Sequence, residues 1–221
     1  RAGRRGSDSF VHIIAIGLNH KTAPVEIREQ LAISPSGLTE TLQHFAHAEH
    51  VAETVVLSTC NRCEVYLVAA DSEAAFAETK RFLQQCGGMN GTPGALLDPH
   101  LYCHLDHACI NHLFRVASGI DSMVIGESQI LAQVKQAFDA ARSQGTSRII
   151  LDELFRRALR VGKRARTETD ISLGALSVGS AAAELAKTIF GDLSGRTILI
   201  LGAGKMSELT SKHLVDNGAA G

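Results

Sequence analysis

The order of apolar patterns over residues 11–105 is the feature that most limits what this chain can fold into. Short buried or alternating apolar runs are typical of strands, and helical stretches separate the first strand from the second and the third from the fourth. The segments are a strand over Val11–Leu18, a short helix opened by Thr22-Ala23-Pro24, a helix from Pro35 toward His50, strands over Glu53–Leu57 and Glu64–Ala70, a helix over about Ser72–Cys86, and a strand near Leu101–Leu105. This β-α-β-β-α-β order predicts a ferredoxin-like α+β core in a chain of the α/β class.

From Asp106 onward the pattern is helical, so we expect helices added to this core. Apolar residues recur at helical spacing between Ile130 and Ala141. The later segments are a long helix over about Ser147–Thr167, a helix of small residues over about Ala175–Phe190, a strand Arg196–Leu201, a glycine turn and a helix reaching Asn217. A strand, a glycine turn and a helix form the first unit of a nucleotide-binding sheet. We therefore expect one domain over 11–170, including the long linker helix, and the beginning of a Rossmann-type domain over 171–221 of a longer protein.

Composition excludes several classes of function. The 22 basic and 23 acidic residues give a formal charge of −1, which offers no global argument for nucleic-acid binding. No run approaches the roughly 20 apolar residues of a membrane span, so we expect a soluble, intracellular chain with no membrane partner. Residues 1–10 are expected to be a disordered arm, a tag remnant or the stub of a transit peptide. Five cysteines without regular spacing argue against a disulfide framework and indicate free thiols.

A basic stripe is expected on the long helix. Arg156, Arg160, Lys163 and Arg164 share one face of it. Such a stripe can follow a phosphate backbone. The alternative is a solvated face whose cations pair with nearby acidic residues, namely Asp152, Glu153 and Glu168, and the sequence does not favour either.

The stretch HLYCHLDHACINH, His100–His112, concentrates imidazoles and thiols. His104 with His107, or Cys109 with His112, has the spacing of metal-ligand pairs. A second pair at zinc-finger spacing is missing, and on a helix these groups point in different directions. We therefore expect no metal site here.

The glycine turn after the predicted last strand points to a dinucleotide. Gly202 and Gly204 match the first two positions of G-x-G-x-x-G, with Ser207 at the third. Backbone N–H groups at the start of the next helix can then face a pyrophosphate. Any tight strand-to-helix turn can also use Gly-Ala-Gly, so the signal is moderate.

The segment Cys60-Asn61-Arg62-Cys63 permits a redox pair, half a zinc site, or one nucleophile beside an unrelated cysteine. A strand follows Cys63, whereas a thioredoxin-like pair opens a helix, and the chain has no second C-x-x-C. Cys60 follows a strand among polar residues, and Arg62 is suited to stabilise a thiolate or to bind a carboxylate. A buried structural cysteine is the competing interpretation.

Five distinctive sequence blocks follow one another through nearly the whole chain from Ile14. They are GLNHKTAPV (Gly17–Val25), STCNR (Ser58–Arg62), ASGIDSMVIGESQILAQVKQA (Ala117–Ala137), VGKRARTETDI (Val161–Ile171) and LGAGKM (Leu201–Met206). Together they resemble the glutamyl-tRNA reductase family. A match over several blocks is far more specific than any single motif.

The resemblance implies an enzyme that reduces glutamyl-tRNA to glutamate-1-semialdehyde with NADPH, the first step of five-carbon-route tetrapyrrole biosynthesis. It implies that the Cys60 thiolate attacks the aminoacyl ester, that tRNA leaves, and that hydride transfer to the thioester releases the aldehyde. His112 matches a histidine important for activity, through orientation or proton transfer. The matching substrate positions are Thr59, Asn61, Arg62, Ser122, Glu127, Ser128, Gln129 and Gln133, and Arg62 suits the substrate's side-chain carboxylate. The matching NADPH positions are Gly202, Ala203, Gly204, Lys205, Met206 and Ser207.

The implied partners are glutamyl-tRNA(Glu), a second copy through a C-terminal domain absent from this chain, and glutamate-1-semialdehyde aminomutase. The expected location is the cytoplasm, with the plastid stroma as the alternative. Two positions depart from the family: Ser128 stands where many relatives carry proline, and Cys63 occupies a variable position. Two other functions stay open: an aldehyde-dehydrogenase-like thioester oxidoreductase, and a non-catalytic tRNA-binding or regulatory fragment.

Overall fold

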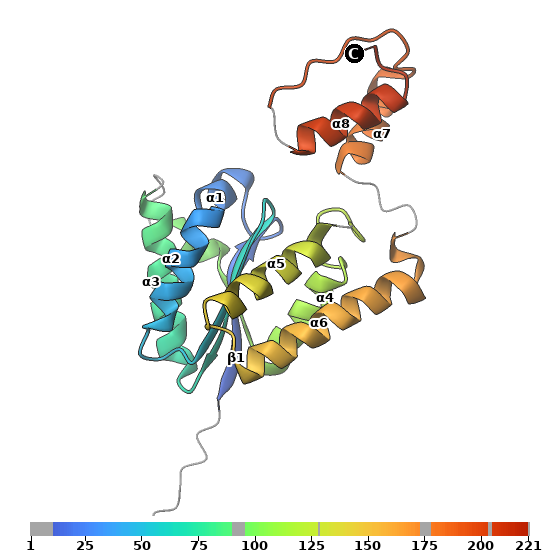
Figure 1. The fold of residues 1–221 in the computed structure, drawn as a ribbon. Coiled ribbons are helices and arrows are strands. Elements are labelled where there is room, and N and C mark those ends of the chain that lie inside the picture. The colour runs from blue at the N-terminus through green and yellow to red at the C-terminus, as the bar shows by residue number, and fades with distance from the viewer. Residues whose placement is uncertain (1–10, 90–95, 128, 173–177, 203–204, 221) are drawn as a thin grey trace, which may run out of the picture.

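A four-stranded antiparallel sheet forms the centre of the larger part of the chain (Figure 1). The computed structural model describes residues 11–89, 96–127, 129–172, 178–202 and 205–220. The strands are β1 (His12–Asn19), β2 (Glu53–Ser58), β3 (Arg62–Ala69) and β4 (Tyr102–Leu105), in the order β2-β3-β1-β4. Every neighbouring pair is antiparallel. The predicted α/β class and the β-α-β-β-α-β order are confirmed.

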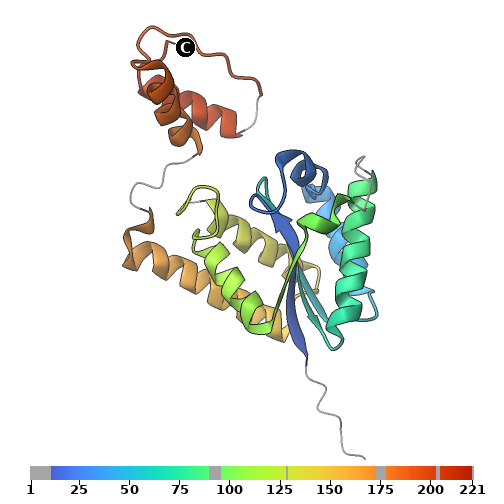
Figure 2. The same cartoon turned by 180° about the vertical axis from the view of Figure 1, so that it is seen from behind.

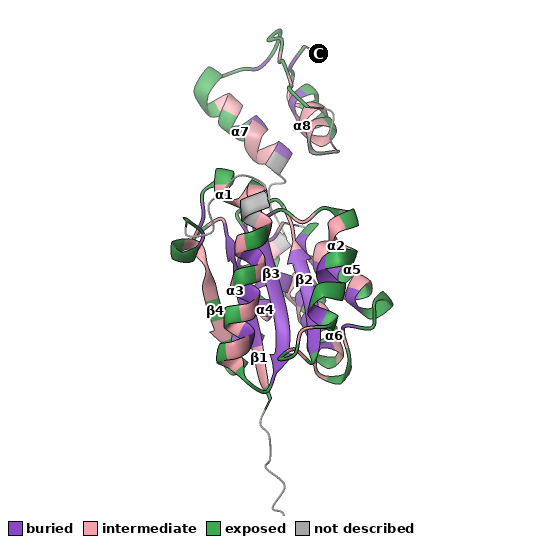
Figure 3. Ribbon diagram, turned by 90° about the vertical axis from the view of Figure 1, so that its left-hand side faces the viewer, coloured by how far each residue is buried: buried purple, intermediate pink, exposed green. Residues whose placement is uncertain are grey.

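Helices cover both faces of this sheet (Figures 1 and 2). One face carries α1 (Val25–Gln30), α2 (Pro35–Ala46) and α3 (Ser72–Met89), and the other carries α4 (Asp106–Ala117), α5 (Gln129–Ser143) and α6 (Ile149–Glu168). Short 3-10 helices lie at Asp98–His100 (η2) and Asp170–Ser172 (η3). Because both faces are covered, all eight residues of β3 are buried, as Figure 3 shows.

A buried carboxylate at the start of β2 anchors helix α6. The Glu53 side chain accepts hydrogen bonds from the backbone N–H groups of Arg148 (2.9 Å), Ile150 (2.9 Å) and Leu151 (2.8 Å). These are N–H groups at the helix start that have no partner within the helix, and a carboxylate there also interacts well with the helix dipole. Glu53 thereby joins the sheet edge to the long helix.

The C-terminal part contains α7 (Val178–Phe190) and α8 (Lys205–Asp216), which share a small core of Ala183, Leu193, Leu214 and Ala219. The predicted strand Arg196–Leu201 is wrong. Among the described residues, Thr197 alone in this segment has a ladder partner, in a parallel bridge with Ala220. A strand needs neighbours that take up its backbone groups and cover its side chains, and Leu199 and Leu201 are 83% and 87% exposed. None of the helices within the described ranges is both long and apolar enough to cross a bilayer.

Candidate functional site

Cys60 lies on the tight turn that joins β2 to β3. The Thr59 N–H donates to the Arg62 carbonyl (2.8 Å), and the Thr59 hydroxyl accepts from the N–H groups of Asn61 (3.1 Å) and Arg62 (3.2 Å). Local side-chain bonds of this kind fix a turn. They leave the Cys60 side chain exposed.

Two neighbouring segments brace this turn from outside. Arg28, on α1, donates from Nη1 to the Cys60 carbonyl (3.0 Å) and to the Asn61 Oδ1 (2.7 Å). The His20 N–H, in the turn after β1, donates to the Asn61 carbonyl (2.9 Å). The sequence analysis missed Arg28, because it lies 32 residues before Cys60 and belongs to no chemical motif.

The surroundings of Cys60 favour the protonated thiol over the thiolate. Partial desolvation of this surface thiol raises its pKa and the negative charge of Glu127 raises the pKa further, while a backbone hydrogen bond and the charge of Arg28 partly oppose both effects. The cation that favours the thiolate is therefore Arg28, whereas Arg62, predicted either to stabilise a thiolate or to bind a carboxylate, is buried. Nucleophilic attack requires that this proton leave first.

Arg62 points away from the solvent into the layer between β3 and α4. Its side chain is 1% exposed, and its Nη1 donates to Glu64 Oε1 at 2.6 Å. Its Nη2 donates to the backbone carbonyl of Asp121, whose carboxylate lies 4.0 Å from Nη1. The guanidinium thus has internal partners, and its expected contact with a substrate carboxylate stays a prediction.

Glu64 is the centre of a buried polar network. It accepts hydrogen bonds from Arg62, from the Tyr66 hydroxyl (2.6 Å), from the Tyr102 hydroxyl, and from His112 Nε2 (3.0 Å). Burial alone would raise its pKa, but the charge of Arg62 and the hydrogen bonds hold the pKa far below the usual range. Sequence reasoning missed this residue. The available signal was the alternation of Arg62, Glu64 and Tyr66, which places three polar groups on one face of a buried strand.

His112, on α4, links this network to the segment that follows the helix. Its Nε2 faces Glu64 and its Nδ1 lies 3.6 Å from the Asp121 carboxylate. The rings of His104 and Tyr102 lie beside it, with centroids at 4.6 Å and 5.4 Å. Within the described residues, no three His, Cys, Asp or Glu side chains are placed to bind a metal ion.

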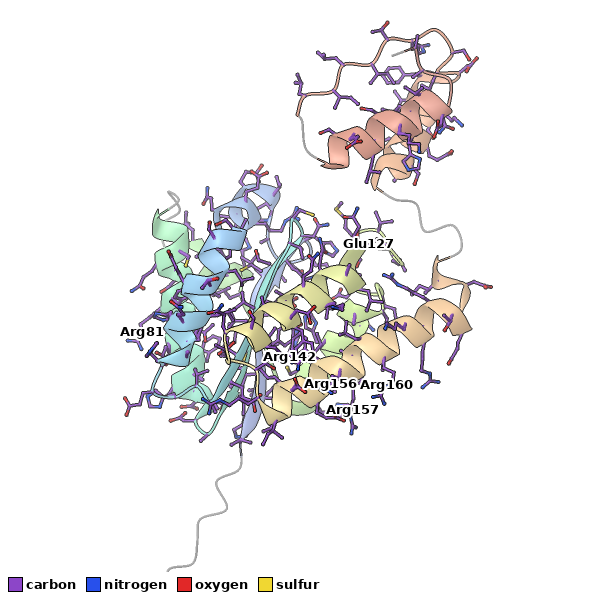
Figure 4. The ribbon with its side chains drawn as sticks, viewed as in Figure 1. Arg81, Glu127, Arg142, Arg156, Arg157 and Arg160 are labelled. Carbon is purple, nitrogen blue, oxygen red and sulfur yellow. The ribbon has the colours of Figure 1, made fainter. Side chains whose placement is uncertain are left out.

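The connection between α4 and α5 holds the next predicted residues. It folds tightly, because the Gly126 N–H donates to the Gly119 carbonyl (3.0 Å) and both glycines have positive φ. Ser122 is buried in this connection, and Glu127 is half-buried near Cys60, at the place labelled in Figure 4. Gln129 is exposed and Gln133 half-buried on α5, while Ser128 lies outside the described residues.

Cys63 is separated from Cys60 by its environment. It is 2% exposed in β3, and burial raises the pKa of its thiol to about 12. All five cysteines are free. The C-x-x-C pair therefore consists of one accessible and one inaccessible thiol.

Two of the four cations of the basic stripe on α6, Arg156 and Arg164, form ion pairs along the helix. Arg156 pairs with Asp152 (2.7 Å), Arg157 with Glu153 (2.6 Å) and Arg164 with Glu168 (2.9 Å). In the part of the chain that the structure describes, Arg160 and Lys163 form no ion pair. Figure 4 shows several of these arginines along the outer side of α6. Arg156 and Arg164 thus belong to a paired, solvated face, whereas Arg160 and Lys163 are the two stripe cations without such a partner among the described residues.

The glycine turn is described only at its two ends. Gly202 has φ +127°, and a Cβ atom there would lie 3.1 Å from the Ser207 hydroxyl. Ala203, Gly204 and the side chains of Lys205 and Met206 lie outside the described residues. The position therefore suits glycine at the start of α8.

Fold and site define a class: a mixed α/β protein with an exposed cysteine and a buried ionic network at one end of its sheet, followed by a pair of helices with a glycine turn before the second. Residues 16–169 match the family model "Glutamyl-tRNAGlu reductase, N-terminal domain", and residues 184–221 match "Shikimate / quinate 5-dehydrogenase". The chain belongs to the glutamyl-tRNA reductase family.

Individual relatives agree with this family. The chain is 48% identical to the glutamyl-tRNA reductase of Geobacter sulfurreducens, over 96% of this chain and 48% of the relative. It is 49% identical to that of Shouchella clausii, over 95% of this chain and 46% of the relative. A solved glutamyl-tRNA reductase from Methanopyrus kandleri superposes with a TM-score of 0.61 and 38% identity, over 94% of this chain and 47% of that chain. The chain spans about half the length of the curated relatives it matches.

Proposed function

We propose that this chain carries the substrate-activating half of an NADPH-dependent glutamyl-tRNA reductase. Residues 11–170 form the catalytic domain, and residues 171–221 begin the NADPH-binding domain. The observation that carries the proposal is the position of Cys60. It is an exposed thiol on a braced turn, at the sheet end where Arg62, Glu64 and His112 form a buried network, in a chain of this family.

The first step we propose is transfer of the glutamyl group to Cys60. The thiol loses its proton, a C–S bond forms at the ester carbonyl, the bond to the ribose oxygen breaks, and that oxygen takes a proton as tRNA leaves. Arg28 and Thr59 hold the turn, so that the sulfur meets the ester in one geometry. His112, hydrogen-bonded to Glu64, is assigned to orientation or proton transfer.

The described end of the glycine turn fits a dinucleotide phosphate. Gly202 lies close to Ser207, at the start of α8, and the missing Cβ leaves the backbone accessible there. Ser207 and the backbone of Lys205 and Met206 are the described groups that would hold NADPH. When bound, NADPH supplies the hydride that converts the thioester into the aldehyde and returns Cys60 to its free form.

The test is a mass-spectrometric search for the glutamyl-enzyme, made without NADPH so that acylation is measured alone. The protein is incubated with glutamyl-tRNA, quenched in acid and digested with trypsin. Trypsin cuts after Arg28, Arg62 and Lys80, so Cys60 and Cys63 fall in different peptides, 29–62 and 63–80. We expect the adduct on the 29–62 peptide.

Two variants sharpen this test. Cys60→Ser should lose the thioester, and Cys63→Ala should keep it, because Cys63 is inaccessible. An unmodified 29–62 peptide in protein that deacylates glutamyl-tRNA at the normal rate would contradict the mechanism. Reaction with a free aldehyde, and none with aminoacyl-tRNA, would favour an aldehyde-dehydrogenase-like enzyme instead.

A further inference from the structure

A cavity of about 590 Å³ lies between the turn after β1, strand β4 and helix α4. Its lining includes Lys21, Tyr102, His104, His107, His112 and Arg115. We call it the β4–α4 pocket. Its volume is that of a typical small-molecule site, and the Cys60 mechanism uses only His112 from its wall.

The β4–α4 pocket opens at the same end of the sheet as Cys60. In the β1–β3 ladder, Asn19 pairs with Arg62, and Asn19 lines the pocket. The next residue, His20, donates its N–H to the Asn61 carbonyl at 2.9 Å. A group bound in this pocket therefore lies next to the turn that carries the reactive thiol.

Charge in the pocket favours an anion. Lys21 and Arg115 contribute two cations, and Asp121, which is paired with Lys21, contributes one carboxylate. Arg115 is exposed and has no ion-pair partner among the residues that the structure describes. One cation is thus available for a phosphate, and a guanidinium binds phosphate well.

Aromatic rings form another part of the wall. The ring centroids of Tyr102 and His104 lie 5.0 Å apart, and those of His104 and His112 lie 4.6 Å apart. Partial burial and the nearby His112 lower the pKa of His104 more than Glu64 and Asp121 raise it, which favours the neutral ring. Nucleic-acid bases stack on such rings.

Another cavity among the described residues at this end of the sheet has the wrong charge for a nucleotide. It is about 430 Å³ in volume and lies between α1, α2 and α3, and its charged lining residue is Glu40. A carboxylate without a cation repels a phosphate. The two cavities therefore differ in what they can bind.

We propose that the β4–α4 pocket binds the 3′-terminal adenosine of the aminoacyl-tRNA, with its base on the Tyr102–His104 rings and its phosphate on Arg115. This inference rests on the proposed function, because the reacting ester joins the glutamyl group to the ribose of that nucleotide. When the carbonyl carbon is at Cys60, the adenosine lies one sugar ring away. The β4–α4 pocket is the cationic cavity at that place.

The kinetic test compares Arg115→Ala with Arg81→Ala. Both arginines are exposed, and Arg81 is on α3, on the opposite face of the sheet (Figure 4). We expect Arg115→Ala to raise the glutamyl-tRNA concentration that gives half-maximal Cys60 acylation rate about tenfold, with the maximal rate constant of acylation little changed. Acylation by a small glutamyl thioester that lacks a nucleotide should not change, and Arg81→Ala should behave as wild type with both substrates.

Two further measurements isolate the terminal nucleotide. Uncharged tRNA ending in CCA should inhibit acylation, and tRNA trimmed of its last adenosine should inhibit about tenfold less. In the Cys60→Ser protein, AMP should bind, and Arg115→Ala should weaken this binding whereas Arg81→Ala should not. AMP binding tests the pocket even if no Cys60 acylation is found, so failure of the proposed function and failure of this inference are distinguishable.

Three results would overturn the inference. Normal acylation in which Arg115→Ala equals Arg81→Ala would place the adenosine elsewhere and leave the proposed function intact. Equal inhibition by intact and trimmed tRNA would show that the last nucleotide is not bound. AMP binding weakened equally by both substitutions would indicate a general charge effect.

Discussion

Replacement of Glu64 by glutamine should destabilise the protein strongly, because it removes the charge opposite a buried arginine. Glu64 is fully buried, and the Arg62 side chain is 1% exposed. In the Glu64→Gln variant, the nearest remaining carboxylate to Arg62 Nη1 is that of Asp121, at 4.0 Å. Removal of one partner from a buried ion pair costs about 3–5 kcal/mol. Domains of this size have a free energy of unfolding of about 5–15 kcal/mol.

The assay is urea unfolding at pH 7, followed by circular dichroism. The matched control is Glu153→Gln, which removes an exposed ion pair with Arg157 at 2.6 Å and should leave the free energy of unfolding nearly unchanged. A second variant, Arg62→Met combined with Glu64→Gln, removes both charges and should recover part of the loss. Glu64→Gln within about 1 kcal/mol of wild type would refute the argument that the pair is buried and essential.

The pH dependence gives an independent check of the same reasoning. Burial raises the pKa of Glu64, but the Arg62 charge outweighs it, so the folded-state pKa lies well below that of the unfolded chain, which is about 4.3. A depressed carboxyl pKa stabilises the fold above the unfolded pKa, and this stability is lost as pH falls through the folded pKa. The difference in free energy of unfolding between wild type and Glu64→Gln should have its largest value at pH 6 and should shrink below about pH 4. A constant difference down to pH 3 would contradict this.

Four other substitutions test the Cys60 turn, the start of α6 and the packing of β1 against β3. Arg28→Ala should raise the pKa of Cys60 and Glu127→Gln should lower it, because Arg28 favours the thiolate and Glu127 opposes it. The rate of iodoacetamide alkylation, measured against pH, gives both pKa shifts. Two shifts in the same direction would contradict these roles. Glu53→Gln should reduce the free energy of unfolding by about 1–3 kcal/mol, since three N–H groups at the start of α6 lose a carboxylate. Urea unfolding measures this loss, and an unchanged midpoint would show that Glu53 does not anchor α6. Gly17→Ala should cost about 3 kcal/mol or prevent folding, because its Cβ would overlap the backbone of β3; a normal melting temperature would contradict this.

The strands around the site were predictable because each has its partners nearby and a clear apolar pattern. β2 and β3 are joined by a short turn, and both lie against apolar helices. The segment Arg196–Leu201 has an equally good pattern and forms no strand in the structure. Ile198 and Ile200 pack against the small C-terminal core, but Leu199 and Leu201 on the other side of the segment are exposed and have no covering layer. Apolar pattern predicts a strand only where neighbours complete a sheet.

The site was predictable in its nucleophile and not in its supports. Cys60 stands out locally, because polar residues surround it after a buried strand. Arg28 contacts the turn although it lies 32 residues earlier in the chain, and the role of Glu64 becomes visible only in the fold, where α4 places His112 against it. Such contacts depend on tertiary packing, and spacing along the chain does not encode them. The resemblance to a family supplied His112, whereas the residues that hold it came from the structure.

In this site, different residues react and position: Cys60 reacts, and the buried network around Arg62 holds the turn in place. The β2–β3 turn reverses direction between Cys60 and Arg62, so the sulfur faces solvent while the guanidinium, two residues later, enters the buried layer. A buried charge needs full pairing, which Glu64 and Asp121 supply, and full pairing makes Arg62 rigid. Since the Arg62 carbonyl also accepts from the Thr59 N–H, a rigid Arg62 fixes the start of the turn and with it the Cys60 backbone. The buried network therefore acts on the exposed thiol through the backbone. Loss of the Glu64–Arg62 ion pair should increase the mobility of the Cys60 backbone before it unfolds the domain.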